Sequence, residues 1–391
     1  MKLVFYSIIL NNHQANVADE LWRMLGDEYR FVELVAPCEG NAKGGTDDYA
    51  SRPYLLKAWQ SEEAWQDAMR LARIADCCVF SGLPALPFEK ERMRLGLLSF
   101  DMSERWMKRG WLNALSPAIR RMMMAYWTGG WARKPIYKLC NGAFVCPDQL
   151  KLRTFPGKCY KWGYFTQVGD FDVEASLDVS TTNITPLMWC SRYLSWKHPE
   201  LPVLAAKRLK DRGYRFVINM YGTGGHEERT RRLAHELDVE DVVRFKGTLP
   251  NDQLMAEMRR HEIFLFTSDR NEGWGAVANE SMANGCALVA SDAIGSVPYL
   301  VKDGDNGLMF RSAATNSSFD NVDESALNDL TEKVMWLLDN KPKLNEIRKN
   351  AVLTMQKTWS QENAARSLLQ LINDLQNGKD TSIMEGPCSK A

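Results

Sequence analysis

The sequence predicts an α/β protein with two domains, each built on a parallel sheet that helices cover on both faces. A chain of 391 residues with 45% apolar residues is long enough to form two hydrophobic cores. Short apolar runs alternate with segments of helical periodicity, first near the N-terminus and again after residue 185. A polar, acidic stretch without periodicity, residues 169–185, lies between the two alternating regions and is predicted to be a linker.

The N-terminal domain is expected to span residues 1–175. Its strand-length apolar runs are KLVFYSIIL, RFVELV and CCVFSG, and ANVADELWRMLGDEY and EAWQDAMRLARIA have helical spacing. Alternation of this kind is typical of a Rossmann-like parallel sheet.

The C-terminal domain is expected to span residues 184–358. Strands are predicted at PLMWCSRYL, RFVINMYG, VVRFKG, IFLFTS and CALVAS, with helices between them. Two Rossmann-like domains joined by a linker predict a ligand cleft between them. An amphipathic helix at about 360–377 is expected to pack back on the first domain, and residues 378–391 are predicted to be disordered because they have little to bury.

Composition excludes several classes of protein. Lys+Arg and Asp+Glu both number 49, so no global field favours nucleic acid as a partner. The opening apolar run is too short for a signal sequence or a membrane span. The nine cysteines contain no CxxC pair, which favours reduced thiols and a cytoplasmic location. The five histidines are dispersed, so no metal site is predicted.

A basic, aromatic and Met-rich stretch covers about residues 102–138, and two interpretations of it stay open. The first is a pair of surface helices whose cations are solvated. The second is an interfacial element that contacts an anionic membrane from its inner face, with Trp106, Trp111, Trp127 and Trp131 at headgroup level.

The segment NEGWGAVANE is the most informative in the chain. Gly273 and Gly275 lie in a loop that a ligand can approach closely, and a helix beginning near Ala276 would direct free N–H groups at a diphosphate. Glu280, inside this helix, could accept hydrogen bonds from ribose hydroxyls. Glu272, before it, could reach the hydroxyls of a sugar beyond the phosphates.

Two cations complete this candidate site. Arg192 and Lys197 are five residues apart where the strand PLMWCSRYL ends, and together they could neutralise the two phosphates of a nucleoside diphosphate. The turn formed by Gly222, Thr223 and Gly224 follows another strand and is predicted to lie at the same edge of the sheet.

With these residues in view, the C-terminal half resembles the family-four retaining glycosyltransferases of the GT-B fold. EGWGAVANE matches the E-x7-E signature of that family, and SRYLSWK is similar to its Arg-x4-Lys element. The resemblance runs through YGTGG, VVRFKGTLP and NGLMF in the expected order. It implies that Arg192 and Lys197 bind the donor diphosphate and act in catalysis together with Glu272. The segment from Gly273 through Trp274 to Gly275 would then hold the donor sugar, and Glu280 the ribose.

The resemblance also implies the reaction. A hexosyl group would pass from a nucleotide-sugar, which is a substrate rather than a cofactor, to a hydroxyl of a saccharide or lipid-linked saccharide used in surface polysaccharide synthesis. The configuration of the anomeric carbon would be retained, and donor binding would need no divalent cation.

The N-terminal half fits the family less well. Its first strand is followed by NNHQ where the family often has a Gly-rich loop, and we expect His13 and Gln14 of this segment to contact the acceptor or the sugar. A second departure is Pro298 followed by Tyr299, where the family commonly has Pro-Glu.

Other functions are consistent with parts of the pattern. A sugar-nucleotide epimerase of the same fold would share the diphosphate site, and so would a non-catalytic sugar-nucleotide-binding protein. A metal-dependent transferase would need the triplet Asp170-Phe171-Asp172 after a buried strand, whereas it lies in the predicted linker. An NAD oxidoreductase would need a full G-x-G-x-x-G, which YGTGGHEE lacks.

Overall fold

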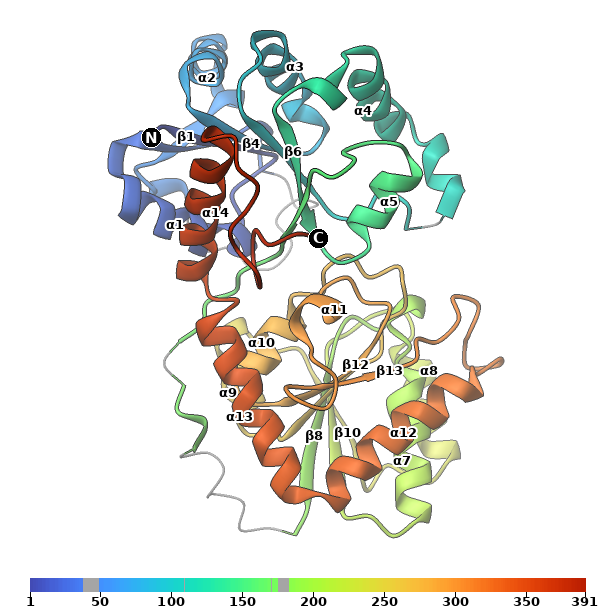
Figure 1. Cartoon of the computed structure of the whole chain (residues 1–391). Helices are drawn as coiled ribbons and strands as arrows, with labels where there is room; N and C mark the ends of the chain where they lie inside the picture. Colours follow the sequence, from blue (N-terminus) through green and yellow to red (C-terminus); the bar gives the residue numbers. More distant parts are fainter. Residues whose placement is uncertain (38–48, 109, 170, 175–182) are drawn as a thin grey trace. The chain divides into compact units, whose positions relative to one another are not determined.

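The structure is a computed structural model that describes residues 1–37, 49–108, 110–169, 171–174 and 183–391. The chain divides into two compact units, the first comprising Met1–Gln167 with Thr358–Ala391 and the second Val168–Lys357 (Figure 1). Each unit contains one parallel sheet with helices, in agreement with the predicted fold class.

The sheet of the first unit has seven strands in the order β3-β2-β1-β4-β5-β6-β7. Its neighbouring strands are all parallel. The strands are β1 Leu3–Ser7, β2 Tyr29–Glu33, β3 Leu55–Lys57, β4 Cys77–Ser81, β5 Ser99–Ser103, β6 Ile136–Asn141 and β7 Cys159–Trp162. The helices are α1 Asn12–Leu25, α2 Glu62–Ile74, α3 Leu86–Leu95, α4 Pro117–Thr128, α5 Val145–Lys151 and α14 Gln361–Gln376. Helix α14 packs against α1.

The sheet of the second unit has six strands in the order β10-β9-β8-β11-β12-β13, also parallel throughout. The strands are β8 Thr185–Cys190, β9 Phe216–Tyr221, β10 Val243–Gly247, β11 Ile263–Phe266, β12 Ala287–Ser291 and β13 Leu308–Phe310. The helices are α7 Glu200–Asp211, α8 Glu227–Glu236, α9 Asn251–Met258, α10 Val277–Ala283, α11 Val297–Leu300, α12 Glu324–Asp339 and α13 Lys341–Lys357.

The chain after Gln167 contacts the second unit earlier than the predicted boundary at residue 175. Arg259 of that unit lies 5.4 Å from the ring centre of Phe171, and Lys349 forms an ion pair with Glu174. These contacts attach the start of the predicted linker to the second unit. Residues 170 and 175–182, including Asp170 of the DxD triplet, lie outside the described residues.

The prediction that residues 378–391 are disordered is wrong. The backbone of this segment pairs with the edge strand β7: Cys388 N–H donates to the carbonyl of Lys161 at 2.7 Å, and Lys161 N–H donates to that of Ser389 at 2.8 Å. Cys388 is fully buried. An unpaired strand edge offers hydrogen-bonding groups to any extended segment, and this main-chain pairing, together with the burial of residues 386–389, orders the tail.

Candidate functional site

The strand order of the second unit creates a switch point between β8 and β11. The chain proceeds from β8 through β9 to β10 on one side and then returns to β11 on the other side of β8. Ligands of open α/β sheets bind outside the carboxyl ends of the strands at such a point. The segment with Arg192 and Lys197 follows β8, and the loop with Glu272 follows β11, so both predicted elements flank the switch point.

Lys197 and Glu272 form an ion pair between these two segments. Their side chains are 11% and 15% exposed, so the pair is largely screened from solvent. The Lys197 ammonium also lies 5.8 Å from the ring centre of Phe266. Gly275 makes this packing feasible, because a Cβ at its positive φ of 83° would lie 2.6 Å from the Phe266 ring.

Glu280 lies inside α10, as predicted, and is the fourth residue of this helix, at the end of its first turn. Burial raises the pKa of its carboxyl to about 7. Burial also raises the pKa of the Cys190 thiol to about 12; the charge of Glu280 adds to this rise and that of Lys197 opposes it. Both charges therefore act on the Cys190 thiol at the end of β8. Glu280 follows Glu272 by eight residues in the segment after β11.

Arg192 is exposed and has no ion-pair partner among the described residues. Its backbone position depends on two glycines after β9. A Cβ on Gly222 would lie 2.0 Å from the carbonyl oxygen of Ser191, and one on Gly224 would lie 2.7 Å from the main chain of Tyr193. These glycines therefore have a structural role in seating the Arg192 segment, and ligand contact by Gly222, Thr223 and Gly224 stays a prediction.

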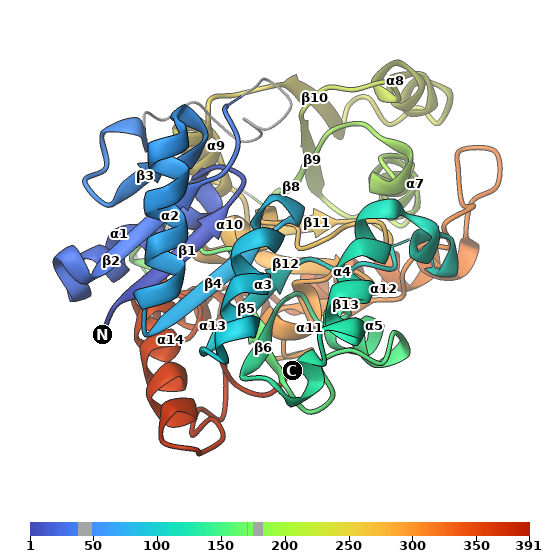
Figure 2. The same ribbon diagram turned by 90° about the horizontal axis from the view of Figure 1, so that it is seen from above.

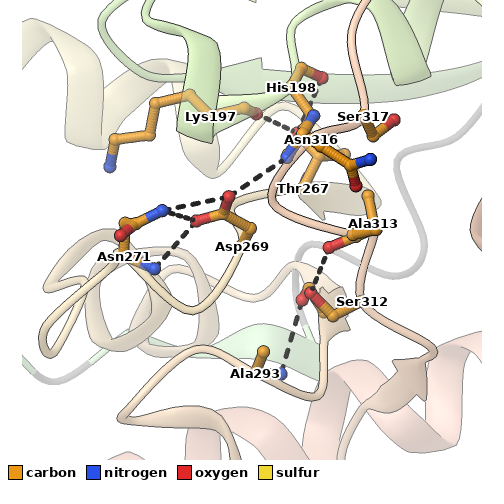
Figure 3. A network of polar contacts seen from close by, with 12 residues as sticks. Lys197, His198, Thr267, Asp269, Asn271, Ala293, Ser312, Ala313, Asn316 and Ser317 are labelled. Atoms are coloured by element: carbon orange, nitrogen blue, oxygen red, sulfur yellow. Dashed lines mark hydrogen bonds and ion pairs between the residues drawn. The ribbon is translucent and has the colours of Figure 1, made fainter. Parts of the chain in front are cut away.

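A buried cluster of charged side chains, His198, Glu200 and Asp269, supports the segment that contains Lys197. This cluster was not predicted from the sequence. His198 Nδ1 lies 2.9 Å from a carboxylate oxygen of Glu200. Its Nε2 lies 3.5 Å from a carboxylate oxygen of Asp269 (Figure 3). Burial alone would lower the pKa of His198, but the two carboxylates outweigh it and raise the pKa to about 9. The imidazolium thus joins the segment after β8 to the loop after β11.

Hydrogen bonds reinforce this connection between the two segments. The Thr267 hydroxyl donates to the carbonyl of Lys197 at 2.6 Å (Figure 3), and Asp269 N–H donates to that of Trp196 at 2.9 Å. The carboxylate of Asp269 accepts from the main-chain N–H of Asn271 at 2.8 Å, and Glu272 N–H donates to the carbonyl of Asp269 at 3.0 Å. The positions of Lys197 and Glu272 are therefore set by main-chain anchors.

Trp274, which we predicted to contact the donor, has its side chain in the core. The ring is fully buried, and its Nε1–H donates to the amide oxygen of Asn279 at 2.7 Å. A large aromatic ring next to α10 gains more from packing than from exposure, so only the main chain of Gly273, Trp274 and Gly275 could face a ligand. Ala276 is the residue that precedes α10.

His13 and Gln14 lie in the first unit, in the first turn of α1 rather than in a loop after β1. The His13 ring stacks on Tyr164, with ring centres 4.9 Å apart. Burial lowers the pKa of His13, and the charge of Glu104 partly opposes this. Gln14 donates a long hydrogen bond of 3.4 Å to the hydroxyl of Ser7 at the end of β1. Their contact with a substrate stays a prediction.

Within the described residues, no three His, Cys, Asp or Glu side chains are grouped as metal ligands would be. The cysteines in the same residues are all free thiols. No helix in the described part of the chain combines the length and apolar character that a membrane span requires.

The sequence of the second unit matches a known family. Residues 186–353 match the model of the family described as glycosyl transferases group 1. A D-inositol 3-phosphate glycosyltransferase of Corynebacterium aurimucosum is 34% identical over 139 residues, which cover 34% of this chain and 32% of the relative. The putative colanic acid biosynthesis glycosyltransferase WcaL of Salmonella typhimurium is 28% identical over 37% of this chain and 39% of its own length. The chain thus spans about a third of the length of these curated relatives.

Solved structures resemble nearly the whole chain. Anabaena Alr3699/HepE in complex with UDP has a TM-score of 0.67 at 14% identity, over 95% of this chain and 100% of that protein. Sucrose-phosphate synthase from Thermosynechococcus elongatus has a TM-score of 0.64 at 13% identity, over 97% and 100%. The chain therefore has the fold of the GT-B glycosyltransferases, and its residues 186–353 match glycosyl transferases group 1.

Proposed function

We propose that this protein is a glycosyltransferase that moves a sugar from a nucleotide-sugar to a hydroxyl of an acceptor. The observation that carries the proposal is the ion pair of Lys197 and Glu272 at the switch point of the second sheet, followed on α10 by the carboxyl of Glu280. The family match over residues 186–353 and the relatives named as glycosyltransferases support it.

The charges at the switch point suit a departing nucleoside diphosphate. The guanidinium of Arg192, which has no ion-pair partner among the described residues, could pair with phosphate oxygens in a forked geometry. Lys197 is already held by its main chain, so its ammonium would meet the charge that builds on the phosphate as the glycosidic bond breaks. We infer that donor binding needs no divalent cation, since these cations supply the neutralising charge.

The ion pair between Lys197 and Glu272 couples phosphate binding to sugar binding. A phosphate that attracts the Lys197 ammonium would weaken its hold on Glu272, and the carboxylate could then accept hydrogen bonds from sugar hydroxyls. Glu280 would accept hydrogen bonds from the ribose once its carboxyl is ionised. We infer retention of the anomeric configuration from the similarity of these motifs to the family-four enzymes.

We propose a saccharide or lipid-linked saccharide as the acceptor, in surface polysaccharide or glycoconjugate synthesis. The relative named for colanic acid biosynthesis supports this class. We also propose that residues 102–138 bring the chain to the inner face of an anionic membrane, where a lipid-linked acceptor would be found.

The test is a thermal unfolding panel with nucleoside diphosphates and nucleotide-sugars, followed by turnover assays. A ligand that binds only the folded state adds about 2.7 kcal/mol to the free energy of unfolding at 100 times its Kd. Arg192→Ala should abolish this shift, and Arg212→Ala, an exposed arginine at the end of α7, serves as the matched control. The absence of any shift across the panel would contradict the donor site.

Turnover separates the alternative functions. Release of nucleoside diphosphate that depends on an added saccharide supports glycosyl transfer. Conversion of the nucleotide-sugar to its epimer without an acceptor would indicate an epimerase. A thermal shift without either reaction would indicate a sugar-nucleotide-binding protein. A transfer rate that falls on treatment with EDTA would contradict metal-independent donor binding.

A further inference from the structure

The first unit carries an exposed apolar ridge on the 3-10 helix Gly110–Leu115 and on α4. The ridge consists of Trp111, Leu112, Leu115, Met124 and Trp127, which are 65%, 73%, 65%, 53% and 45% exposed. Large apolar side chains scattered singly on a surface are ordinary, but five exposed within residues 111–127 make this segment a candidate interaction surface.

The ridge differs from the interfacial element that the sequence analysis described. Trp131 is buried in the core and Trp106 packs against the buried Lys138, whose ammonium lies 4.6 Å from its ring centre. Trp131 therefore cannot lie at headgroup level, and Trp106 is only partly exposed. Trp111 and Trp127 keep their predicted exposure.

A cationic groove of about 770 Å³ adjoins the ridge. It runs between α3 and α4, which lie side by side in Figure 2, and reaches the turn that follows α4. No carboxylate of the described part of the chain lines it. Its lining cations are Lys90, Arg94, Arg121 and Lys134.

Three of these cations have no carboxylate partner among the described residues. Arg94 pairs with Glu91, whereas Lys90, Arg121 and Lys134 form no ion pair there. A group of unpaired cations in a concave surface attracts a multivalent anion strongly because they repel one another in its absence. Two of the groove cations, on α3, lie outside residues 102–138.

The groove and the ridge belong to one face of the unit. Arg121, Met124 and Thr128 are spaced three and four residues apart, so they lie along one side of α4, and all three line the groove. Met124 is also part of the ridge. Apolar and cationic groups therefore meet on the same helix, as they do on surfaces that lie in a membrane interface.

We propose that this face docks on an anionic phospholipid bilayer, with lipid phosphates in the groove and the ridge among the headgroups and upper acyl chains. The exposed tryptophans of the ridge, Trp111 and Trp127, suit the headgroup level. The charge of the groove selects anionic lipid, whereas the ridge binds any lipid. The inference deepens the proposed membrane contact, but it concerns binding alone and is independent of sugar transfer.

Co-sedimentation with vesicles tests the proposal. The full chain should pellet with phosphatidylglycerol vesicles at low salt and should remain in the supernatant with phosphatidylcholine vesicles. Each cation near an anionic membrane contributes about a 5-fold gain in affinity, so Lys90→Gln, Arg121→Gln and Lys134→Gln together should weaken binding about 100-fold.

A matched triple variant controls for net charge. Lys357→Gln, Arg366→Gln and Lys379→Gln remove three exposed cations from the C-terminal part of the chain and should leave vesicle binding unchanged within about 2-fold. A ridge variant, Leu112→Ser with Trp127→Ser, should weaken binding to phosphatidylglycerol while the groove cations remain. Thermal unfolding of each variant confirms that it is folded.

Three results would overturn the proposal. The first is wild-type protein that stays in the supernatant with phosphatidylglycerol vesicles. The second is equal loss of binding in the control triple variant, which would make the effect one of net charge. The third is binding that survives removal of the groove cations, which would assign the contact to another surface. Loss of glycosyl transfer with unchanged vesicle binding bears only on the proposed reaction.

Discussion

Glu280→Gln should make the protein more stable at alkaline pH and weaker in donor binding. Burial raises the pKa of Glu280 from 4.5 to about 7, so the folded state holds the proton more tightly than the unfolded state does. Each unit of pKa difference corresponds to 1.36 kcal/mol. The group therefore lowers the free energy of unfolding by about 3 kcal/mol as the pH rises from below 4.5 to above 7.

Glutamine has nearly the same shape and no charge to desolvate, so the variant escapes this penalty. Because Glu280 is partly exposed, we expect about 2 kcal/mol of added stability at about pH 8.5 and little difference at about pH 4.5. For a unit of the size of Val168–Lys357, that gain corresponds to roughly 5 °C in Tm. Loss of charge-assisted hydrogen bonds to the ribose should weaken donor binding by about 10-fold to 100-fold.

Glu280→Gln should therefore raise the stability at alkaline pH and lower the affinity for the donor. Chemical unfolding of wild type and Glu280→Gln across this pH range gives the stability difference, and titration calorimetry with the donor gives the affinity. Glu332→Gln, an exposed glutamate on α12, is the control and should change neither. A variant that is no more stable at alkaline pH would refute the burial argument. Unchanged donor affinity would refute the assignment of Glu280 to the ribose.

Further predictions concern the supports of the site. The raised pKa of His198 means that its charged form stabilises the fold fully below pH 6.5 and that this stability is lost as the pH rises through about 9. In urea unfolding, His198→Gln should therefore lower the free energy of unfolding by about 3 kcal/mol at about pH 6 and by far less at about pH 10. Gly222→Ala should cost about 2 kcal/mol or more of stability by the same assay, whereas Gly225→Ala, with nothing near its added Cβ, should stay within about 0.5 kcal/mol. In a double-mutant cycle of unfolding, Lys197→Met and Glu272→Gln should couple by about 1 kcal/mol, and additive effects would contradict the ion pair.

Much of the second unit could be predicted from apolar periodicity. Strands β9, β10, β11 and β12 lie within predicted runs, and β8 begins one residue before its run. The central strands β8, β9, β11 and β12 are buried on both faces, so their apolar residues are nearly continuous. In the first unit, β5 and β6 were not predicted as strands, because each contains a charged residue. Asp101 and Lys138 form a buried ion pair across these two strands, so each strand contains a charge where the pattern expects an apolar residue.

The cluster of His198, Glu200 and Asp269 could not be predicted either, but for a different reason. His198 and Glu200 are close in sequence, but Asp269 lies far along the chain, and only the pairing of β8 with β11 brings it to His198. When Asp269 is not known to be close, the sequence pattern of His198 next to Lys197 predicts a surface residue. Long-range pairing of polar side chains has no periodicity that a single sequence can reveal.

The glycines of the matched motifs act on the site through the fold. A Cβ on Gly222 would collide with the main chain beside Arg192, and one on Gly275 would collide with Phe266, on whose ring Lys197 lies, and would approach Glu272 at 3.2 Å. Gly222 and Gly275 therefore determine the positions of the charged side chains, whether or not a ligand contacts these glycines. It follows that the motif combines residues that carry charge with residues that place it. Substituting the second kind should reduce stability and donor binding together, whereas substituting Glu280 should change them in opposite directions.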